Sequence, residues 1–280
     1  MLYVARRRVA EEPVSKLATW SRRLALFAIA VVLLVIVIVN LGFLDPLPAI
    51  ATLAGSLFFA LVAMILALGA FVVIWRQGLR GLGLAAAALG IGFVMLAYPA
   101  YLGVLFYRLP AVNDITTDPV DPPRFDARLR PRGANPIAYP GAAAMQLQRA
   151  AYPDIEPLLV SVPPLEAYDA ALAVIKKRKW IIVDERAPQT GRREGRIAAV
   201  AHTPIMGFRD DIVVRVRAAE DGARIDMRSA SRYGRHDFGT NAARLRSLSN
   251  DIDDAAGAEK AKPKPLPKSP PKKSAQPAKR

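Results

Sequence analysis

The 280-residue chain contains no cysteine, which excludes disulfide bonds and thiolate chemistry. Histidine is almost absent: His202 and His236 are the only two, and neither has a partner at the spacing of metal ligands. A serine hydrolase would need Ser229 or Ser231 beside one of these histidines and Asp237, but no nucleophile-elbow pattern accompanies them. The sequence therefore predicts neither a zinc site nor a catalytic triad, and we expect no cofactor.

Charged side chains are missing from three long apolar stretches, residues 24–44, 50–75 and 81–107. At about 1.5 Å per helical residue, the first stretch covers about 31 Å, which matches a hydrocarbon core of about 30 Å. The sequence therefore predicts three transmembrane helices. Because no ionisable residue lies in the middle of any of them, a proton pump or an ion-coupled carrier is disfavoured.

The basic residues that flank these stretches predict their orientation, because Lys and Arg in short flanks stay in the cytoplasm. They gather before the first stretch and between the second and the third: Arg6, Arg7, Arg8, Lys16, Arg22, Arg23, Arg76 and Arg80. The opposite ends carry only Asp45 and Arg108. We therefore expect a multi-pass protein of a bacterial cytoplasmic (inner) membrane, with residues 1–23 in the cytoplasm and the chain after Arg108 in the periplasm.

Small residues recur at helical spacing in the third stretch, at Gly83, Ala86, Ala87 and Gly90. Such spacing lets helix backbones approach closely. We interpret it as packing of this helix on its own neighbours, and the alternative is an interface between copies of the chain.

The chain after Arg108 is predicted to contain a Pro-rich extended linker over residues 108–157 and an α+β domain over residues 158–254. Strands are expected at residues 158–162, 180–185, 195–203, 210–217 and 223–229, and helices from residues 163 and 240. The predicted fold class is α+β, with a small antiparallel sheet in the order βαββββα and two helices on one face.

Residues 255–280 are rich in Lys and Pro and read as a disordered tail. The tail and a net charge of +15 suggest anionic partners. In a membrane protein, lipid headgroups or an anionic envelope polymer are better candidates than nucleic acid. The tail is interpreted either as a solubilising segment or as an electrostatic docking segment.

Two of the predicted strands carry the candidate site. Alternation places Ile212, Val214 and Val216 on one face, and arginines with Asp226 on the other. Arginine offers a planar fork for carboxylates and phosphates. The candidate binding residues, from these strands and the helix start beyond them, are Arg209, Asp210, Asp211, Arg215, Arg217, Arg228, Arg232, Asp237 and Asn241.

Each of these residues also has a structural interpretation. The arginines on the sheet could form a cross-strand ladder of ion pairs on a solvated face. Asp210 and Asp211 are neighbours on a strand and face opposite sides, so pairing with Arg209 or Arg228, or turn capping, is favoured over shared catalysis. The Asn241 region could bind an anion at a helix N-terminus or only cap that helix.

The segments NDITTDPVDPP, YPDIEP, GRIAAVAHTPIMGFRDDIVVRVR and RIDMRSASRYGRHDFGTNAARLR closely resemble the bacterial family called domain of unknown function 1499. The resemblance covers residues 113 to 252, and members often carry N-terminal membrane helices. At His236 the family would have a small polar residue. The positions that match its motifs are Arg209, Asp210, Asp211, Arg215, Arg228, Ser229, Ser231, Arg232, Gly234, Asp237, Gly239, Asn241 and Ala242. The family has no activity to carry over, so the resemblance implies architecture only.

These observations favour a membrane-anchored, non-catalytic module that binds an anionic lipid or envelope polymer. One alternative is an enzyme that uses Asp210, Asp211 or Asp237 with an arginine clamp. Another is a membrane scaffold that acts through its helices.

Overall fold

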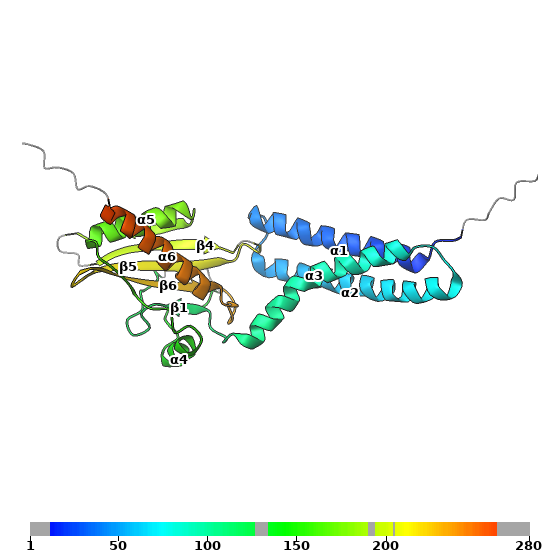
Figure 1. Ribbon diagram of the computed structural model, residues 1–280, viewed down its shortest axis with the longest axis horizontal. Coiled ribbons are helices and arrows are strands. Elements are labelled where there is room, and N and C mark those ends of the chain that lie inside the picture. The colour runs from blue at the N-terminus through cyan, green and yellow to red at the C-terminus, as the bar shows by residue number, and fades with distance from the viewer. Residues whose placement is uncertain (1–11, 127–133, 190–193, 204, 262–280) are drawn as a thin grey trace, which may run out of the picture.

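The computed structural model describes residues 12–126, 134–189, 194–203 and 205–261 (Figure 1). The basic residues Arg6, Arg7 and Arg8 and the Lys/Pro-rich residues 262–280 lie outside the described residues, so the structure does not bear on the predictions made for them.

Three long helices come first: α1 (Lys16–Asn40), α2 (Pro46–Gln77) and α3 (Leu82–Arg108). All three are long and apolar enough to cross a membrane, as predicted. The Ser15 side chain caps α1 by accepting a hydrogen bond from the Ala18 amide at 3.4 Å, and α1 ends at Asn40, within the predicted stretch. Helix α2 starts at Pro46, a residue whose fixed φ suits a first helical position.

The three helices pack through small side chains. Buried alanines from all three form one cluster: Ala18, Ala25, Ala63, Ala67, Ala70, Ala85 and Ala88. The face of α3 that packs is thus not the one predicted, because Gly83, Ala86, Ala87 and Gly90 are exposed. A side chain added at Gly83 or Gly90 would meet nothing within 4 Å. Packing of these four residues within the bundle was therefore a wrong prediction, and the interface between copies stays a prediction.

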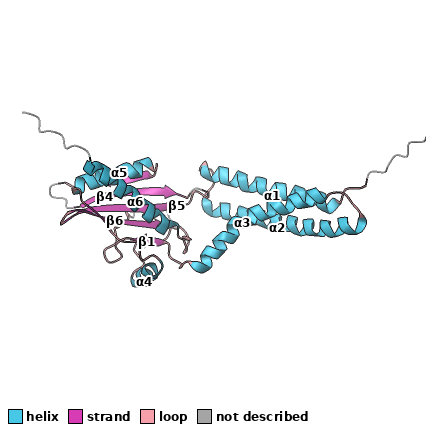
Figure 2. Ribbon diagram, in the orientation of Figure 1, coloured by secondary structure: helices cyan, strands magenta, loops and turns pink. Residues whose placement is uncertain are grey.

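The rest of the described chain forms an α+β domain at one end of the helix bundle (Figure 1). Its elements are β1 (Asp114–Thr116), α4 (Ala142–Ala151), β2 (Leu158–Val160), α5 (Pro164–Lys177), β3 (Ile181–Arg186), β4 (Glu194–His202), β5 (Arg209–Ala219), β6 (Gly222–Ser231) and α6 (Thr240–Ala261). The strands form one antiparallel sheet in the order β1-β6-β5-β4-β3, and β2 also pairs with β6. Helices α5 and α6 lie side by side over one face of this sheet (Figure 2). The predicted α+β class is confirmed, while α6 continues to Ala261, into the segment predicted as a tail.

The segment 108–157, predicted to be an extended linker, is partly folded and belongs to the sheet. Strand β1 pairs with β6, with Ile115 opposite Ser229. The other edge of β1 is closed by a side chain of α4: Gln148 accepts a hydrogen bond from the Thr116 amide at 3.1 Å and donates one to the Thr116 carbonyl at 2.6 Å. A side-chain amide thus replaces a neighbouring strand. Strand β1 could not be predicted from the sequence, because a strand of three residues is too short to show an alternation of apolar and polar side chains.

The hydrophobic core lies between the sheet and the two helices. The predicted inward residues Ile212, Val214 and Val216 are fully buried there, and so are Ile225 and Met227 of β6. The helices contribute apolar residues at spacings of three and four: Val174, Ile175, Leu245, Leu248 and Ile252. The predicted alternation of the two central strands is therefore confirmed.

The domain contacts the ends of α1 and α2 through the turn between β4 and β5. Met206 packs in a small cluster with Val35, Val39 and Ala49. The Asn40 side chain donates a hydrogen bond to the Ile205 carbonyl at 3.1 Å. The turn between β4 and β5 therefore docks the domain on the helices.

A second junction joins the domain to the end of α3 through His236. Its Nε2 lies 3.1 Å from the Leu109 carbonyl, and its Nδ1 accepts a hydrogen bond from the Phe238 amide at 2.9 Å. The imidazole ring also stacks on Phe106, with centroids 5.4 Å apart. His236 is thus a structural contact between membrane helix and domain.

Candidate functional site

The face of the sheet opposite α5 and α6 carries the predicted charged residues. Arg215 and Arg217 of β5 lie there beside Arg224, Asp226 and Arg228 of β6, since Arg215 pairs with Asp226 and Arg217 with Arg224 in the ladder. Unlike the solvated face that one interpretation assumed, much of this face is covered by the chain that follows β1. Asp226 is fully buried and Arg228 is 2% exposed.

Carboxylates from the covering segment pair with the arginines. Asp118 accepts a hydrogen bond from Arg224 at 2.9 Å, and Asp121 accepts one from Arg215 at 2.9 Å. Asp226 accepts from Arg215, Arg217 and Arg224 at distances between 2.7 and 3.1 Å. Three carboxylates thus neutralise three guanidinium groups. The ladder interpretation is correct for these residues, except that two of the three acidic partners, Asp118 and Asp121, come from a segment far away in sequence.

Arg228 fastens the same segment to the sheet at the other end. Its Nε and Nη2 donate to the two carboxylate oxygens of Asp114 at 2.8 and 2.6 Å. Its remaining N–H groups reach the carbonyls of Pro123 and Ile137 at 3.0 and 2.9 Å. The guanidinium carbon also lies 4.4 Å from the centre of the Phe125 ring. Four of its five N–H groups donate to the protein and the side chain is buried, so Arg228 has a structural role and is not accessible to a ligand.

The predicted carboxylate pair is split by the strand, as expected. Asp211 accepts a hydrogen bond from Arg232 at 2.7 Å, and Asp210 accepts one from Arg244 of α6 at 2.5 Å. Arg209 at the start of the strand is exposed. The two aspartates therefore hold different arginines on different sides of β5. The predicted partners, Arg209 and Arg228, were wrong, because Arg228 pairs with Asp114 instead.

Asp237 and Asn241 organise the start of α6. The Asp237 carboxylate accepts hydrogen bonds from the Gly239 and Asn241 amides at 2.9 and 2.8 Å, which caps the helix. The Asn241 side chain accepts from Ser229 at 2.7 Å and donates to Ser231 at 2.9 Å. Both residues are buried, so capping explains them and the amides are not free for an anion.

Burial shifts the pKa of two of these aspartates. Desolvation raises the pKa of Asp210, against the lowering effect of Arg244. Desolvation likewise raises the pKa of Asp237, against its two backbone hydrogen bonds. Raised carboxyl pKa values are typical of acid catalysts, but here both groups are at most 6% exposed. A substrate could not reach either carboxyl group in this arrangement, which disfavours an enzyme that uses these residues.

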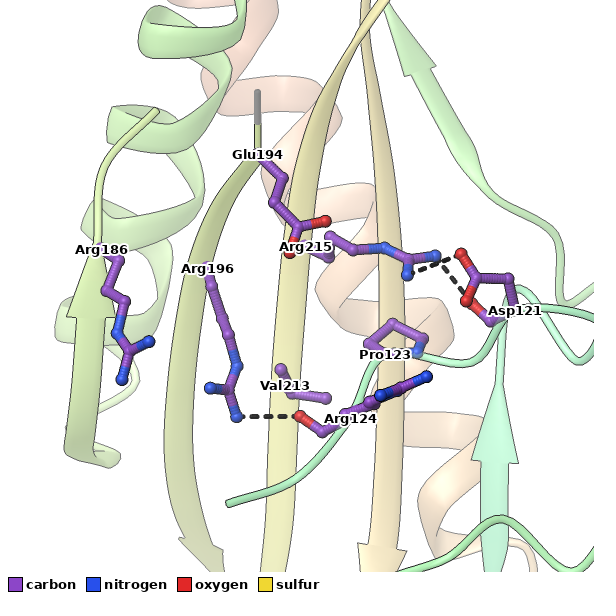
Figure 3. Close-up of a pocket in the computed structure, with 8 residues that line it drawn as sticks. All are labelled: Asp121, Pro123, Arg124, Arg186, Glu194, Arg196, Val213 and Arg215. Carbon is purple, nitrogen blue, oxygen red and sulfur yellow. Dashed lines mark hydrogen bonds and ion pairs between the residues drawn. The ribbon is translucent and has the colours of Figure 1, made fainter. Parts of the chain in front are cut away.

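A hollow of about 460 Å³ opens beside the ion-pair ladder, over β3, β4 and β5 (Figure 3). Its charged lining residues are four arginines and two acids: Arg124, Arg186, Arg196, Arg215, Asp121 and Glu194. Val213 forms part of its floor. This volume lies in the range of small-ligand pockets, about 300–1,000 Å³.

The arginines of this hollow differ in how firmly they are held. Arg196 donates to Asp184 at 3.3 Å and to the Arg124 carbonyl at 2.8 Å, so it ties the covering segment to β4. Arg186 donates to Asp184 at 3.0 Å and is half exposed. Arg124 is exposed, and its guanidinium forms no ion pair with any residue in the described ranges. Arg124 and Arg186 are thus the cations available to a ligand.

A β-bulge in β3 places Asp184 and Arg186 on the face of the sheet that carries the hollow. The register shifts between Ile182 and Asp184, so Ile182 faces the core while Asp184 and Arg186 face the hollow. Without the extra residue, strict alternation would place Ile182 and Asp184 on the same face.

A second hollow of about 380 Å³ lies between α4 and the edge of the sheet. Its lining is mostly Ala and Pro, with Leu147 and with Arg235 as its one cation. None of its lining residues was predicted as a binding residue.

Sequence reasoning found the sheet arginines but missed their partners and the hollow. The missed residues are Asp114, Asp118, Asp121, Arg124, Asp184, Arg186, Arg196 and Arg244. One usable signal was present: residues 114–121 carry three aspartates just before the arginine-rich strands. In the described part of the chain, no group of three His, Asp or Glu side chains is placed to hold a metal ion.

The fold and these contacts define the class: an α+β domain of unknown activity that follows three candidate membrane-spanning helices. Residues 114–252 match the model of the family described as "Protein of unknown function (DUF1499)". This part of the chain is therefore a domain of that family, in agreement with the resemblance seen in the sequence. A comparison with curated proteins found no match.

Replacing Arg228 tests the fastening of the segment. In Arg228→Met, Asp114 would be left buried without its partner, which we expect to lower the free energy of unfolding by about 3–5 kcal/mol. Adding Asp114→Asn should restore part of that loss. The measurement is unfolding of the detergent-solubilised chain by denaturant, monitored by near-ultraviolet circular dichroism.

The matched control is Arg246→Met, which removes an exposed ion pair with Asp154. It should change stability by no more than about 1 kcal/mol. Equal losses in the two variants would contradict a special role for Arg228.

The raised pKa of Asp237 predicts a pH dependence of stability. The folded protein holds this proton more tightly than the unfolded chain does, since burial raises the pKa above its ordinary 3.8. The contribution is therefore fully present below pH 3.8 and is lost as the pH rises through the raised value. In Asp237→Asn, which keeps a capping oxygen, the free energy of unfolding should fall less over this window.

Asp154 provides the control of opposite sign, because a hydrogen bond from Arg246 lowers its pKa. Its contribution is present above the ordinary pKa and is lost as the pH falls, so Asp154→Asn should lose less stability on acidification. The unfolding midpoint of each variant, measured across the pH range, distinguishes the two. The same pH profile for Asp237→Asn and the unaltered chain would rule out the assignment.

Proposed function

We propose that this protein is a membrane-anchored, non-catalytic binding module that takes an anionic group in the hollow beside the ion-pair ladder. The observation that carries the proposal is that four arginines and only two acids line this hollow. Arg215 and Asp121 belong to the neutralised ladder; without them, three guanidinium groups remain at the hollow against two carboxylates, Glu194 and Asp184, which pairs with Arg186 and Arg196. A concave site with surplus arginine suits phosphate or carboxylate groups, which accept two parallel hydrogen bonds from one guanidinium.

The contacts of the sheet arginines argue against the ladder itself as the binding surface. Arg215, Arg217 and Arg224 share Asp118, Asp121 and Asp226, so a ligand would have to displace carboxylates that already fit them. Arg124 has no carboxylate partner in the described ranges, and Arg186 uses only its Nε for Asp184, so its two terminal nitrogens need no such displacement. The binding site therefore moves from the ladder, where the sequence suggested it, to its rim.

The position of the hollow favours a dissolved or polymer-borne anion over a headgroup of the protein's own membrane. Strand β5 starts beside the helix bundle at Arg209 and reaches the hollow at Val213, about 13 Å farther along at about 3.3 Å per residue. A lipid in the bilayer would have to leave its leaflet to reach this height.

The compartment is also a proposal. The basic residues at one end of the helices support a cytoplasmic N-terminus, with the domain on the periplasmic side of a bacterial inner membrane. Envelope polymers with phosphate or carboxylate groups would then lie within its reach.

Binding is tested with the full chain in lipid nanodiscs and two probes, inorganic pyrophosphate and poly-glutamate, by titration calorimetry. Arg124→Gln with Arg186→Gln should weaken binding of the preferred probe at least about tenfold, since each lost charge-assisted hydrogen bond is worth about 1.5–3 kcal/mol. Arg149→Gln is the control, because Arg149 is an exposed arginine on α4 outside the hollow. Failure of both probes to bind, or equal binding by the double variant and the control, would overturn the site.

The compartment is tested by cysteine labelling, which the absence of native cysteine makes unambiguous. Asp221→Cys in the turn between β5 and β6 should react with a membrane-impermeant maleimide in intact cells. Gln77→Cys at the end of α2 should react only after lysis. The reverse pattern would place the domain in the cytoplasm.

A further inference from the structure

The turn between β4 and β5 has an apolar tip, formed by Ile205, Met206, Gly207 and Phe208. It points away from the core of the domain and lies against the helices. Met206 packs on Val35 and Val39 of α1 and on Ala49 of α2. A β-carbon added at Gly207 would meet the Val39 side chain at 3.4 Å, so the backbone itself is close to α1.

The level of these contacts along α1 places the tip inside the membrane. Val39 follows Arg23, the last basic residue before the apolar stretch, by 16 residues, which is about 24 Å of helix. The hydrocarbon core is about 30 Å thick. A side chain that packs on Val35 and Val39 therefore lies below the boundary of the leaflet on the domain's side.

The surroundings of the tip are apolar and open. Ile205 is 40% exposed, and two residues beyond α1 at the same level are more so, Leu41 at 65% and Phe43 at 80%. In water these side chains would form an unfavourable patch. Lipid tails solvate them at no such cost.

Exposed basic side chains lie at the end of the domain that faces the helices, where headgroups would lie. Arg209 follows the tip directly, and Arg108 and Arg235 lie at the same end of the domain. All three are exposed, and within the described ranges none of them forms an ion pair. An apolar tip with a cationic rim is the arrangement that suits an interface of hydrocarbon and phosphate.

We infer that the β4–β5 tip is inserted into the lipid leaflet on the domain's side, so that the sheet stands on the bilayer as a fixed body. The partner of this surface is the membrane itself. The inference is independent of the hollow, which β5 reaches only farther along, at Val213 and Arg215.

The test uses the full chain in lipid vesicles with a nitroxide label on a single cysteine, since the chain has none of its own. Ile205→Cys leaves the backbone carbonyl that accepts from Asn40 in place. The matched control is Leu159→Cys in β2, another exposed apolar residue, 68% exposed and at the distal end of the sheet. Phe43→Cys is the reference for a label at the end of the helix bundle, where contact with lipid is expected.

Collisions with oxygen report lipid and collisions with a water-soluble nickel chelate report solvent. We expect the label at position 205 to resemble the one at 43, with oxygen access several-fold higher relative to nickel than at 159. If Ile205→Cys does not fold, Phe208→Cys carries the label. Equal nickel access at the tip and at position 159 would show that the tip is in water and would overturn the inference.

Discussion

The domain depends on pairing between buried charges that are far apart in the chain. Arg228 and Asp114 are separated by 114 residues, and both are nearly inaccessible to water. Taking two such groups out of water costs several kcal/mol per ion, which only bidentate geometry and full use of the remaining donors can offset. Arg228 has the bidentate pair with Asp114, and two of its other three N–H groups donate to the carbonyls of Pro123 and Ile137. Its contacts fix where the segment after α3 crosses the sheet.

The hollow is a consequence of that crossing. The segment covers β5 and β6 but leaves β3 and part of β4 open, and Arg196 binds the Arg124 carbonyl at the boundary between them. The arginines under the segment are neutralised by Asp118 and Asp121, whereas those at its edge keep free donors. Arginines on neighbouring strands thus occur both in the neutralised ladder and at the hollow. Composition alone therefore could not distinguish a structural arginine from one proposed to bind a ligand.

Local sequence patterns were sufficient for features that depend on local physics. The three spans follow from the absence of charge, and the faces of β5 and β6 follow from alternation of Val214 and Met227 with Arg215 and Arg228. The folded part of segment 108–157 could not be predicted in this way. Its strand β1 has only three residues, and polar contacts from Gln148 and Arg228 hold it in place instead of an apolar stripe. The hollow depended on a bulge in β3, and one inserted residue leaves no compositional mark. The packing face of α3 was wrong because several small-residue stripes coexist on one alanine-rich helix.

The two junctions with the helices give this arrangement a direction relative to the membrane. A single connection at Leu109 would leave the domain free to rotate, but Met206 between α1 and α2 and His236 against Leu109 constrain it from separate strand ends. Strands β4 and β5 then run away from the bilayer, and the ends of the sheet face different environments. On the two proposals above, lipid contacts would belong to the end that carries Ile205, while an anion bound beside Arg124 would reach the domain through the aqueous phase. A protein built in this way would hold the proposed anion site at a set height above its membrane, which a flexible tether could not do.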